Sequence, residues 1–450
     1  MVELEKRGIP TVSLTAQGFV KDAHRSAAAF GLPGLPIAVA PFPFTNQSPD
    51  AIHGMVDSAF EQVVAGLTLP PGPPPSLPGP VRAEAEVLTI EGEDLLECME
   101  RMNRLFLERG WSDGFPLVPP TRERVEQMLK GAKRRREQTV AVLEPGFGVA
   151  TVEKVAINAV MAGCRPEHLP VLITAVQCLA EPKIYLRNKA MSTGPHAPLV
   201  LVNGPIAQEI GLNSRCCALG PGAPSYANTV IGRALRLCMM NIGHTYPGVS
   251  DMDTIGSPTK YGLCAAENEE ENPWEPYHVE QGFPREASTV TVHFIYGICE
   301  LFDFQNYEPE RLCQVFATAL TNVAQVPTGH WLLGRRGDPR HKVEEKEHHF
   351  LFLCPEHAAI FARNGWGKGK IREVLYRMAR LPFRTLMLNK ERKAMEAAHP
   401  ELAWLWDAPD TLLPVVETPD CFDIAVVGAA AGRGACFYGA GEPVTKPVEG

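Results

Sequence analysis

The chain has 450 residues, of which 45% are hydrophobic and 21% charged, as in an ordinary globular protein. Its 43 basic and 52 acidic residues give a formal net charge of −9, which argues against binding to nucleic acid or to an anionic membrane. No apolar run approaches the roughly 18 residues that cross a bilayer. Glu3 and Glu5 stand where a signal peptide would be basic. We therefore expect a cytoplasmic protein that binds neither nucleic acid nor membrane.

The twelve cysteines are scattered and form no CxxC pair. Most lie within apolar runs, where we interpret them as small buried hydrophobes of a reducing compartment rather than as a disulfide framework. Only Cys164, Cys216, Cys217 and Cys264 have neighbours that suggest chemistry.

The first segment, residues 1–68, is predicted to be a partial parallel α/β unit. Residues 1–8 have the pattern of the last turns of a helix and its Gly stop, without the N-cap residue that usually begins one. Two strand–helix repeats follow, and strands joined by helices in this way run parallel. Two parallel strands cannot bury a core alone, so we expect a further strand from elsewhere. The predicted strands are 9–16 and 35–39, and the predicted helices are 17–30 and 49–67.

A Pro-rich stretch, LPPGPPPSLPGP, predicts a stiff linker over residues 69–83. The remainder, residues 84–450, is predicted to be a larger α/β domain of one or two lobes. Alternating helices and strands indicate a mixed or parallel sheet covered on both faces. The predicted helices are 91–109, 122–136, 151–163, 167–180 and 225–240, and the predicted strands are 139–143, 198–203, 288–295, 350–354 and 422–427.

The long polar segment 241–280 is the richest source of candidate site residues. Loops of this length inside a compact domain are usually functional or disordered, and its aromatic residues argue against disorder. Lys260 could supply a cation to a pocket. Glu267 and Glu269 could add an acid/base pair, and His278 an imidazole. The alternative is a solvated acidic loop.

Two further segments could contribute to a substrate pocket. The Gly- and Pro-rich turn after Asn213 runs into a helix whose Arg233 could pair with a carboxylate or phosphate. Asn158 and Cys164 lie where two apolar helices meet. A helix N-terminus and the adjacent Arg165 would lower the pKa of the Cys164 thiol, whereas a buried structural cysteine is the alternative. We recognise no nucleotide or metal motif, and any cofactor is left open.

Two strand ends near the C-terminus carry weaker signals. The glycine-rich loop 428–434 follows a strand, where α/β sheets commonly bind ligands, although its small residues also permit tight packing. Cys354 follows another predicted strand. His357, three residues later, is either an acid/base group or a hydrogen-bonded core histidine.

With LEKRGIPTV and LPIAVAPFPF, residues 1–68 resemble the C-terminal half of the UGSC family of selenoproteins and their cysteine homologues. DGFPLVPPT, NAVMAGCRPE and KYGLCAAENEEENPWEP resemble the uncharacterised partner region fused to, or encoded beside, such domains. The resemblance implies a preceding Sec/Cys-Gly-Ser-Cys segment, and no such tetrad occurs in this sequence. We expect a start truncated at a selenocysteine codon. The alternatives are a reactive half on a separate polypeptide, or loss of the redox chemistry.

The resemblance implies redox or nucleophilic chemistry of a selenol or thiol on a small molecule. The favoured hypothesis is an oxidoreductase-like, thiol- or selenol-dependent enzyme for a small anionic organic substrate, with its reactive segment missing from this chain. The alternatives are a lyase or hydrolase contained in the large domain, or a non-catalytic subunit that completes a separate thiol-bearing chain. We also expect a homo-oligomer. The expected catalytic residues are Glu267, His278 and Cys164, and the expected substrate-binding residues are Asn158, Asn213, Arg233 and Lys260.

Overall fold

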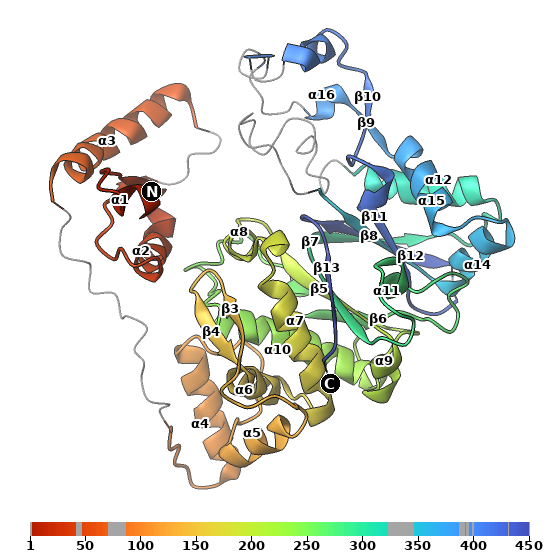
Figure 1. The fold of residues 1–450 in the computed structure, drawn as a ribbon, viewed down its shortest axis with the longest axis horizontal. Coiled ribbons are helices and arrows are strands. Elements are labelled where there is room, and N and C mark those ends of the chain that lie inside the picture. The colour runs from red at the N-terminus through yellow and green to blue at the C-terminus, as the bar shows by residue number, and fades with distance from the viewer. Residues whose placement is uncertain are drawn as a thin grey trace.

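The computed structural model has an α/β architecture (Figure 1). It describes residues 2–41, 47–70, 87–322, 346–386, 392, 396–397, 400–430 and 432–449. The linker predicted at 69–83 falls largely on residues 71–86, which lie outside the described residues, as does one residue of the loop 428–434.

The N-terminal unit is built on two parallel strands, as predicted. β1 (Ser13–Ala16) pairs with β2 (Ile37–Ala40). Helices α2 (Val20–Ala29) and α3 (Pro49–Thr68) follow these strands, and α1 (Val2–Glu5) precedes them. The hydroxyl of Ser48 accepts a hydrogen bond from the backbone of Ala51 and so caps α3, where Pro at the first turn needs no hydrogen bond of its own.

The large domain is built on a seven-stranded mixed sheet with the order β11-β8-β12-β7-β5-β6, in which β13 also pairs with β7. The pairs β11–β8 and β5–β6 are parallel, and the other pairs are antiparallel. The strands are β5 (Ala197–Asn203), β6 (Leu263–Ala266), β7 (Thr289–Phe302), β8 (His349–Leu353), β11 (Phe422–Val426), β12 (Arg433–Gly439) and β13 (Val444–Pro447).

This sheet curls until its two edge strands meet. Asn268, just after β6, donates its backbone N–H to the carbonyl of Val426 at the end of β11, at 2.8 Å. Every second residue of the strands points into the curl and joins one apolar core with Tyr277. The core residues from the strands include Leu199, Leu201, Leu263, Ala265, Ile295, Phe350, Phe352, Ala425 and Phe437.

Helices cover the outside of the curl in two groups, which Figure 1 shows on different sides of the domain. Val200 and Val202 of β5 pack with α6, α7 and α10. Leu351 and Leu353 of β8 pack with α12, α14 and α15. Side chains rather than helices fill the inner face, which differs from the predicted helical cover on both faces. The helices are α6 (Val152–Ala162), α7 (Leu169–Leu179), α10 (Tyr226–Asn241), α12 (Pro309–Leu320), α14 (Pro355–Arg363) and α15 (Lys368–Met378).

The segment 241–280 is not one continuous loop. It contains a 3-10 turn (Pro258–Tyr261), the fully buried strand β6, and α11 (Tyr277–Glu280). The remaining elements include α4 (Leu95–Glu108), α5 (Arg122–Leu129), the antiparallel pair β3 (Thr139–Leu143) and β4 (Gly148–Thr151), and the antiparallel pair β9 (Arg380–Pro382) and β10 (Leu412–Pro414).

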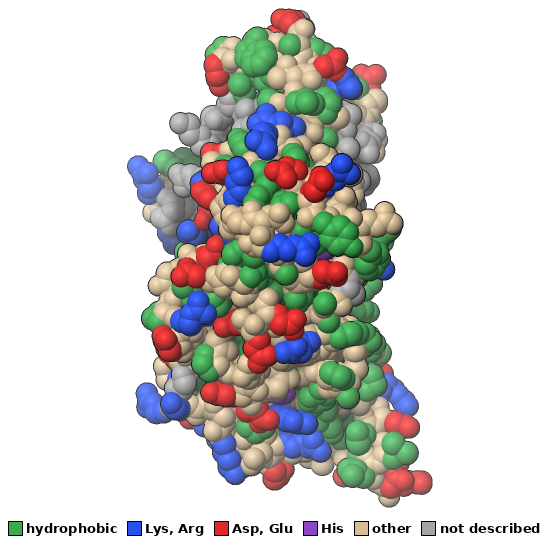
Figure 2. Space-filling view, turned by 90° about the vertical axis from the view of Figure 1, so that its right-hand side faces the viewer, with side chains coloured by type: hydrophobic (Ala, Val, Ile, Leu, Met, Phe, Trp, Pro, Cys, Tyr) green, Lys and Arg blue, Asp and Glu red, His purple; other side chains and the backbone are tan. Residues whose placement is uncertain are grey.

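On the face that carries α14 and α15, basic and acidic side chains are interspersed, with no block of one sign (Figure 2). Among the helices of the described residues, none is by itself long and apolar enough to cross a membrane. One pair, Pro166–Leu179 with Pro182–Ala190, passes on length and composition only and is bent by 72°.

Candidate functional site

A cavity of about 2470 Å³ opens between the segment 108–113, the turn joining β3 to β4, and the segment 244–261. Arg236 of α10 forms part of its wall, and Lys21 of α2 lies at its rim. The volume exceeds the roughly 300–1,000 Å³ of most small-molecule pockets. It could therefore hold a small molecule together with a protein segment.

Two aspartates in the cavity wall hold two cations. Asp251 Oδ2 accepts from Arg236 Nη2 at 2.9 Å, and its Oδ1 lies 2.8 Å from Lys260 Nζ. Asp253 Oδ2 lies 2.8 Å from the same ammonium group. Burial opposes ionisation of Asp253, but Lys260 and two backbone N–H groups outweigh it and hold the pKa of Asp253 below its usual value. The wall thus contains a compact ion-pair cluster with Lys260 at its centre.

Other basic side chains face the cavity. Lys154 lines it and donates to the carbonyl of Val149, a neutral partner, at 2.9 Å, and within the described residues it forms no ion pair. Arg109 also lines the cavity, with its guanidinium 5.0 Å from the centre of the Trp111 ring. Together with Lys21, these groups supply basic side chains that attract anions, in a lining that also contains the carboxylates of Glu108, Asp113, Asp251 and Asp253.

His244 brings an imidazole to the cavity wall, where it stacks on Tyr246 with ring centres 5.9 Å apart. Gly146 makes this position possible, because a Cβ there would lie 2.5 Å from His244 Nδ1. An imidazole ring is thereby held against the cavity.

Two predicted residues lie directly behind the cavity wall rather than in it. Arg233 forms a bidentate pair with Asp113, a lining residue, through bonds of 2.7 and 2.9 Å. Asn158 Oδ1 accepts from Asn241, which also donates to the carbonyl of Trp111. Arg233 and Asn158 therefore position wall segments, and Arg233 already has the carboxylate partner that a substrate was expected to supply.

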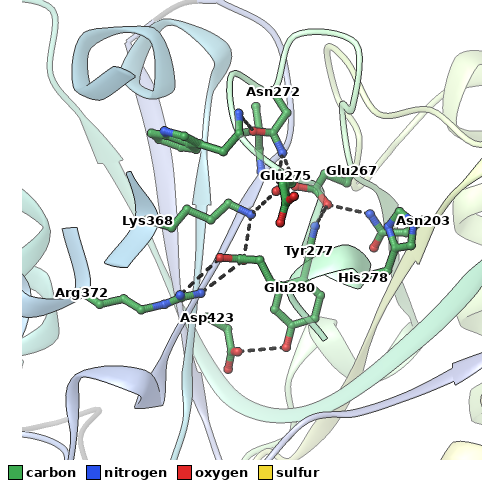
Figure 3. A network of polar contacts seen from close by, with 12 residues as sticks. Asn203, Glu267, Asn272, Glu275, Tyr277, His278, Glu280, Lys368, Arg372 and Asp423 are labelled. Atoms are coloured by element: carbon green, nitrogen blue, oxygen red, sulfur yellow. Dashed lines mark hydrogen bonds and ion pairs between the residues drawn. The ribbon is translucent and has the colours of Figure 1, made fainter. Parts of the chain in front are cut away.

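Glu267 lies in a sealed polar network at the carboxyl ends of β5, β6 and β11 (Figure 3). Its Oε2 accepts from Asn203 at 2.6 Å and from the backbone of Tyr277 at 2.7 Å. Its Oε1 accepts from Asn272 at 2.9 Å and from the backbone of Val426 at 3.3 Å. Burial raises the pKa of Glu267, against these donors. The carboxyl group thus closes the curl of the sheet and does not line the cavity.

The network continues to the base of the curl. Tyr277 donates its hydroxyl to Asp423 at 2.9 Å, and Asp423 accepts from His348 at 2.8 Å. Alongside, Lys368 is 4% exposed and bonds the Glu280 carboxylate at 2.9 Å (Figure 3). These contacts join α11 and α15 to the strand ends.

The other predicted site residues also lie away from the cavity. His278 is buried, with its Nε2 3.2 Å from the Arg285 carbonyl and its Nδ1 3.8 Å from Glu269. Asn213 holds its own loop by donating to the carbonyl of Cys216 and to Ser225.

Of the two interpretations of Cys164, the structure agrees with the buried structural cysteine and not with a thiol of lowered pKa. Cys164 donates to the carbonyl of Val230 at 3.4 Å, and burial raises its pKa. The residue follows Gly163, which ends α6 in a left-handed conformation, and a short 3-10 turn separates it from α7. The thiol therefore does not lie at the N-terminus of an α-helix.

Sequence reasoning missed several residues of the cavity wall: Asp251, Asp253, Arg236, Lys154 and His244. The first two stand in the polar segment from which Lys260 was chosen, and their alternate spacing was the available signal. His244 also stands in this segment, whereas Arg236 lies in α10 and Lys154 in α6, and only the tertiary fold brings these helices to the cavity. Among the described residues, no group of three His, Cys, Asp or Glu side chains is placed to hold a metal ion.

Residues 1–69 match the model of the UGSC family. This N-terminal segment belongs to the UGSC family. No curated protein and no solved structure matches the chain. The UGSC segment contacts the large domain near the cavity, because Ser26 accepts from Arg187 at 2.7 Å and the rings of Phe30 and Phe147 meet edge-on at 5.1 Å. Phe147 is itself a lining residue.

Proposed function

We propose that the chain is a thiol- or selenol-dependent enzyme of the oxidoreductase type, which binds a small anionic organic molecule in the cavity. Lys154, Lys21 and Arg109 would hold the anion, and the Lys260 cluster would move protons. The reactive selenol or thiol would come from a Sec/Cys-Gly-Ser-Cys segment that these 450 residues do not contain.

One observation carries the proposal: the UGSC segment borders a cavity whose charged lining includes Lys21, Arg109 and Lys154. No cysteine of the described chain lines this cavity, so the proposed thiol would have to come from outside the described residues. The cavity is also wide enough to admit a segment beside a small ligand. All twelve cysteines are free, which agrees with the reducing cytoplasm that we propose as its location.

Ligand binding can be tested by titrating a panel of small carboxylates and phosphates into the whole chain in a calorimeter. Lys154→Ala is expected to weaken the best ligand roughly tenfold or more, because a charge-assisted hydrogen bond is lost. Lys183→Ala is the matched control, since that exposed lysine pairs with Glu442 outside the cavity. Unchanged affinity in Lys154→Ala would exclude the cavity as the anion site.

Thiol dependence can be tested with the ligand so identified. The chain is co-expressed with a UGSC protein that carries Cys-Gly-Ser-Cys, and turnover is measured with and without prior alkylation of thiols. Loss of turnover on alkylation is expected. Turnover by the chain alone, insensitive to alkylation, would instead support a lyase or hydrolase.

That second candidate, a lyase or hydrolase, is favoured by the position of Lys260 between Asp251 and Asp253, an arrangement that can exchange protons with a bound molecule. It predicts that Lys260→Met abolishes turnover while the anion still binds. Glu267→Gln would then alter stability more than chemistry, because Glu267 does not reach the cavity.

A third candidate is a non-catalytic subunit. The N-terminal sheet has two strands, and Leu14 of β1 and Phe60 of α3 are 54% and 59% exposed. A partner strand with an apolar face would cover such residues. This candidate predicts a stoichiometric complex with a thiol-bearing UGSC chain on size exclusion, and no turnover by the 450-residue chain.

A further inference from the structure

Two adjacent cysteines, Cys216 and Cys217, lie on the surface of the large domain. Of the twelve cysteines, all within the described residues, these two are exposed and the other ten are buried or partly buried. Their sulfur atoms lie 3.9 Å apart, within reach of a weak S–H···S hydrogen bond. A disulfide bond of about 2.05 Å needs the sulfurs to approach by about 2 Å, which rotation of two exposed side chains can provide. Both thiols are therefore accessible to a reagent and to each other.

Hydrogen bonds hold the backbone of this pair. Asn213 donates its side-chain amide to the carbonyl of Cys216 at 2.7 Å, and Ser225 donates its hydroxyl to the carbonyl of Cys217 at 2.6 Å. The backbone N–H of Gly220 donates to the same Cys217 carbonyl at 2.7 Å. Cys217 is thereby held at φ 58°, a left-handed conformation that residues other than Gly rarely adopt. The turn fixes the backbone of both cysteines and leaves their thiols exposed.

Asn228 joins this turn to α10. Its Oδ1 accepts from the backbone of Asn213 at 2.9 Å, and its Nδ2 donates to the carbonyls of Asn213 and Ala218 at 2.9 and 2.8 Å. Asn228 is buried, and Ala218 packs into the apolar core inside the curled sheet. The two exposed thiols are therefore anchored to the interior of the domain, on a turn that Asn213 supports from within.

We propose that Cys216 and Cys217 form a dithiol site that reduces small disulfides. The Cys216 thiolate attacks one sulfur of the substrate, whose S–S bond breaks as the Cys216 mixed disulfide forms and the first thiolate leaves. Cys217 then attacks the Cys216 sulfur and displaces the second thiolate, which closes a disulfide between the adjacent cysteines. The two thiol protons pass to the two leaving thiolates. One dithiol and one substrate disulfide thus yield one protein disulfide and two small thiols.

The contacts of the pair agree with this order of attack. The hydrogen bond with Cys216 and the charge of Cys216 raise the pKa of Cys217, so Cys217 keeps its proton after Cys216 has ionised. Consecutive Cα atoms lie about 3.8 Å apart, less than the roughly 4.4–6.8 Å of most disulfides. The disulfide formed is therefore strained and easily reduced again, which suits a redox couple rather than a structural cross-link.

The test uses the whole reduced chain, 2-hydroxyethyl disulfide and mass spectrometry of tryptic peptides. A neutral disulfide is chosen because the charged neighbour Arg215 already pairs with Glu270 and Glu271. Trypsin cuts after Arg215 and Arg233, and the peptide between them contains no other cysteine. We expect this peptide to lose two hydrogens as two molecules of 2-mercaptoethanol are released per chain. A peptide that keeps both thiols, or that carries only mixed disulfides, would overturn the proposal.

Two variants separate the two steps of the reaction. Cys217→Ser should stop at the mixed disulfide of Cys216 and release one thiol instead of two. Cys216→Ser should likewise stop at the mixed disulfide of Cys217. Both positions are exposed, so the fold should tolerate serine at either one. Release of two thiols by either variant would show that another cysteine completes the reaction, and would contradict the pair.

Cys299 and Cys436 are the matched control pair. They lie opposite each other on β7 and β12, but Cys436 is fully buried and burial raises its pKa. We expect the Cys216–Cys217 disulfide to form at least about tenfold faster than a Cys299–Cys436 disulfide, and equal rates would contradict a dedicated site. No residue of the turn 213–225 lines the cavity, so this test can fail while the cavity binds its anion, and can succeed when the cavity binds none.

Discussion

The cavity wall and the Glu267 network use the same kinds of residue in opposite ways. Both contain a buried carboxylate, and in both a lysine and an arginine pair with one carboxylate, Asp251 in the wall and Glu280 in the network. Lys260 and Asp251 line the cavity, whereas both carboxylate oxygens of Glu267 accept hydrogen bonds, four in all, from protein donors. A carboxylate with all its acceptor sites taken by the protein stabilises the fold, and one beside a cavity can also meet a ligand.

The two regions also differ in the sign of their pKa shifts. Asp253 is held ionised by Lys260, so its pKa lies below the usual value. Burial raises the pKa of Glu267 and outweighs the charge of Lys368 and the neutral amide and backbone donors, which all lower it. In the cavity wall, Lys260 and the backbone donors outweigh burial, whereas in the network burial outweighs Lys368 and the donors.

The largest effect is expected from Glu267→Ala. The substitution leaves buried donors of Asn203, Tyr277 and Val426 without their acceptor, at the point where the curled sheet closes. We expect a loss of about 3–5 kcal/mol in the free energy of unfolding, measured with urea. Glu270→Ala is the control, because that exposed side chain should cost less than about 1 kcal/mol. A small loss for Glu267→Ala would contradict its role in closing the sheet.

A smaller effect is expected from Arg233→Ala, about 2–3 kcal/mol in the free energy of unfolding. The side chain of Asp113 is 2% exposed and would lose its bidentate partner. Arg233→Lys should rescue little, because an ammonium group cannot form the two parallel bonds. In the double variant Asp113→Asn/Arg233→Ala, the loss should be less than the sum of the two single losses. Additive losses would show that Arg233 acts elsewhere, as in binding an anion.

The opposite pKa shifts predict opposite pH dependence of stability. The pKa of Asp253 in the folded protein lies below its usual 3.8. Its stabilising contribution to the free energy of unfolding is therefore complete above pH 3.8 and is lost as the pH falls through the folded pKa. The pKa of Glu267 in the folded protein lies above 4.5. Its stabilising contribution to the free energy of unfolding is therefore complete below pH 4.5 and is lost as the pH rises through the folded pKa. Urea unfolding from about pH 3 to about pH 8 should show a smaller acid loss in Asp253→Asn. Glu267→Gln should show a smaller fall in the free energy of unfolding as the pH rises. The same pH profile in both variants would refute the opposite pH dependence of Asp253 and Glu267.

Much of the fold could be predicted because its signals are local. The strand–helix spacing of residues 9–67 predicted the parallel pair β1–β2, and long apolar runs predicted β5, β8, α6, α7 and α10. The four-residue strand β6 was missed because its apolar run LCAA is embedded in a polar segment. The curl of the sheet depends on contacts between strands far apart in sequence, such as Asn268 with Val426, and no local pattern encodes it.

The candidate site was less predictable than the fold. Residue type selected Lys260, which lines the cavity, but also Glu267, which is sealed inside the protein. Composition cannot distinguish these two, since both stand in one polar segment seven residues apart. What separates them is β6, which buries the chain between them and carries Glu267 to the sheet edge.

The smallest effect is expected from Arg215→Ala, less than about 1 kcal/mol in the free energy of unfolding. Arg215 pairs with Glu270 and with Glu271 at 2.6 Å, just outside the Glu267 network, but its side chain is 55% exposed. Water solvates each of these charges once the pair is broken, unlike the donors around Glu267. High salt should reduce the effect further, because exposed pairs are screened. A loss comparable with that of Glu267→Ala would show that the surface pairs and the sealed network form one cooperative unit.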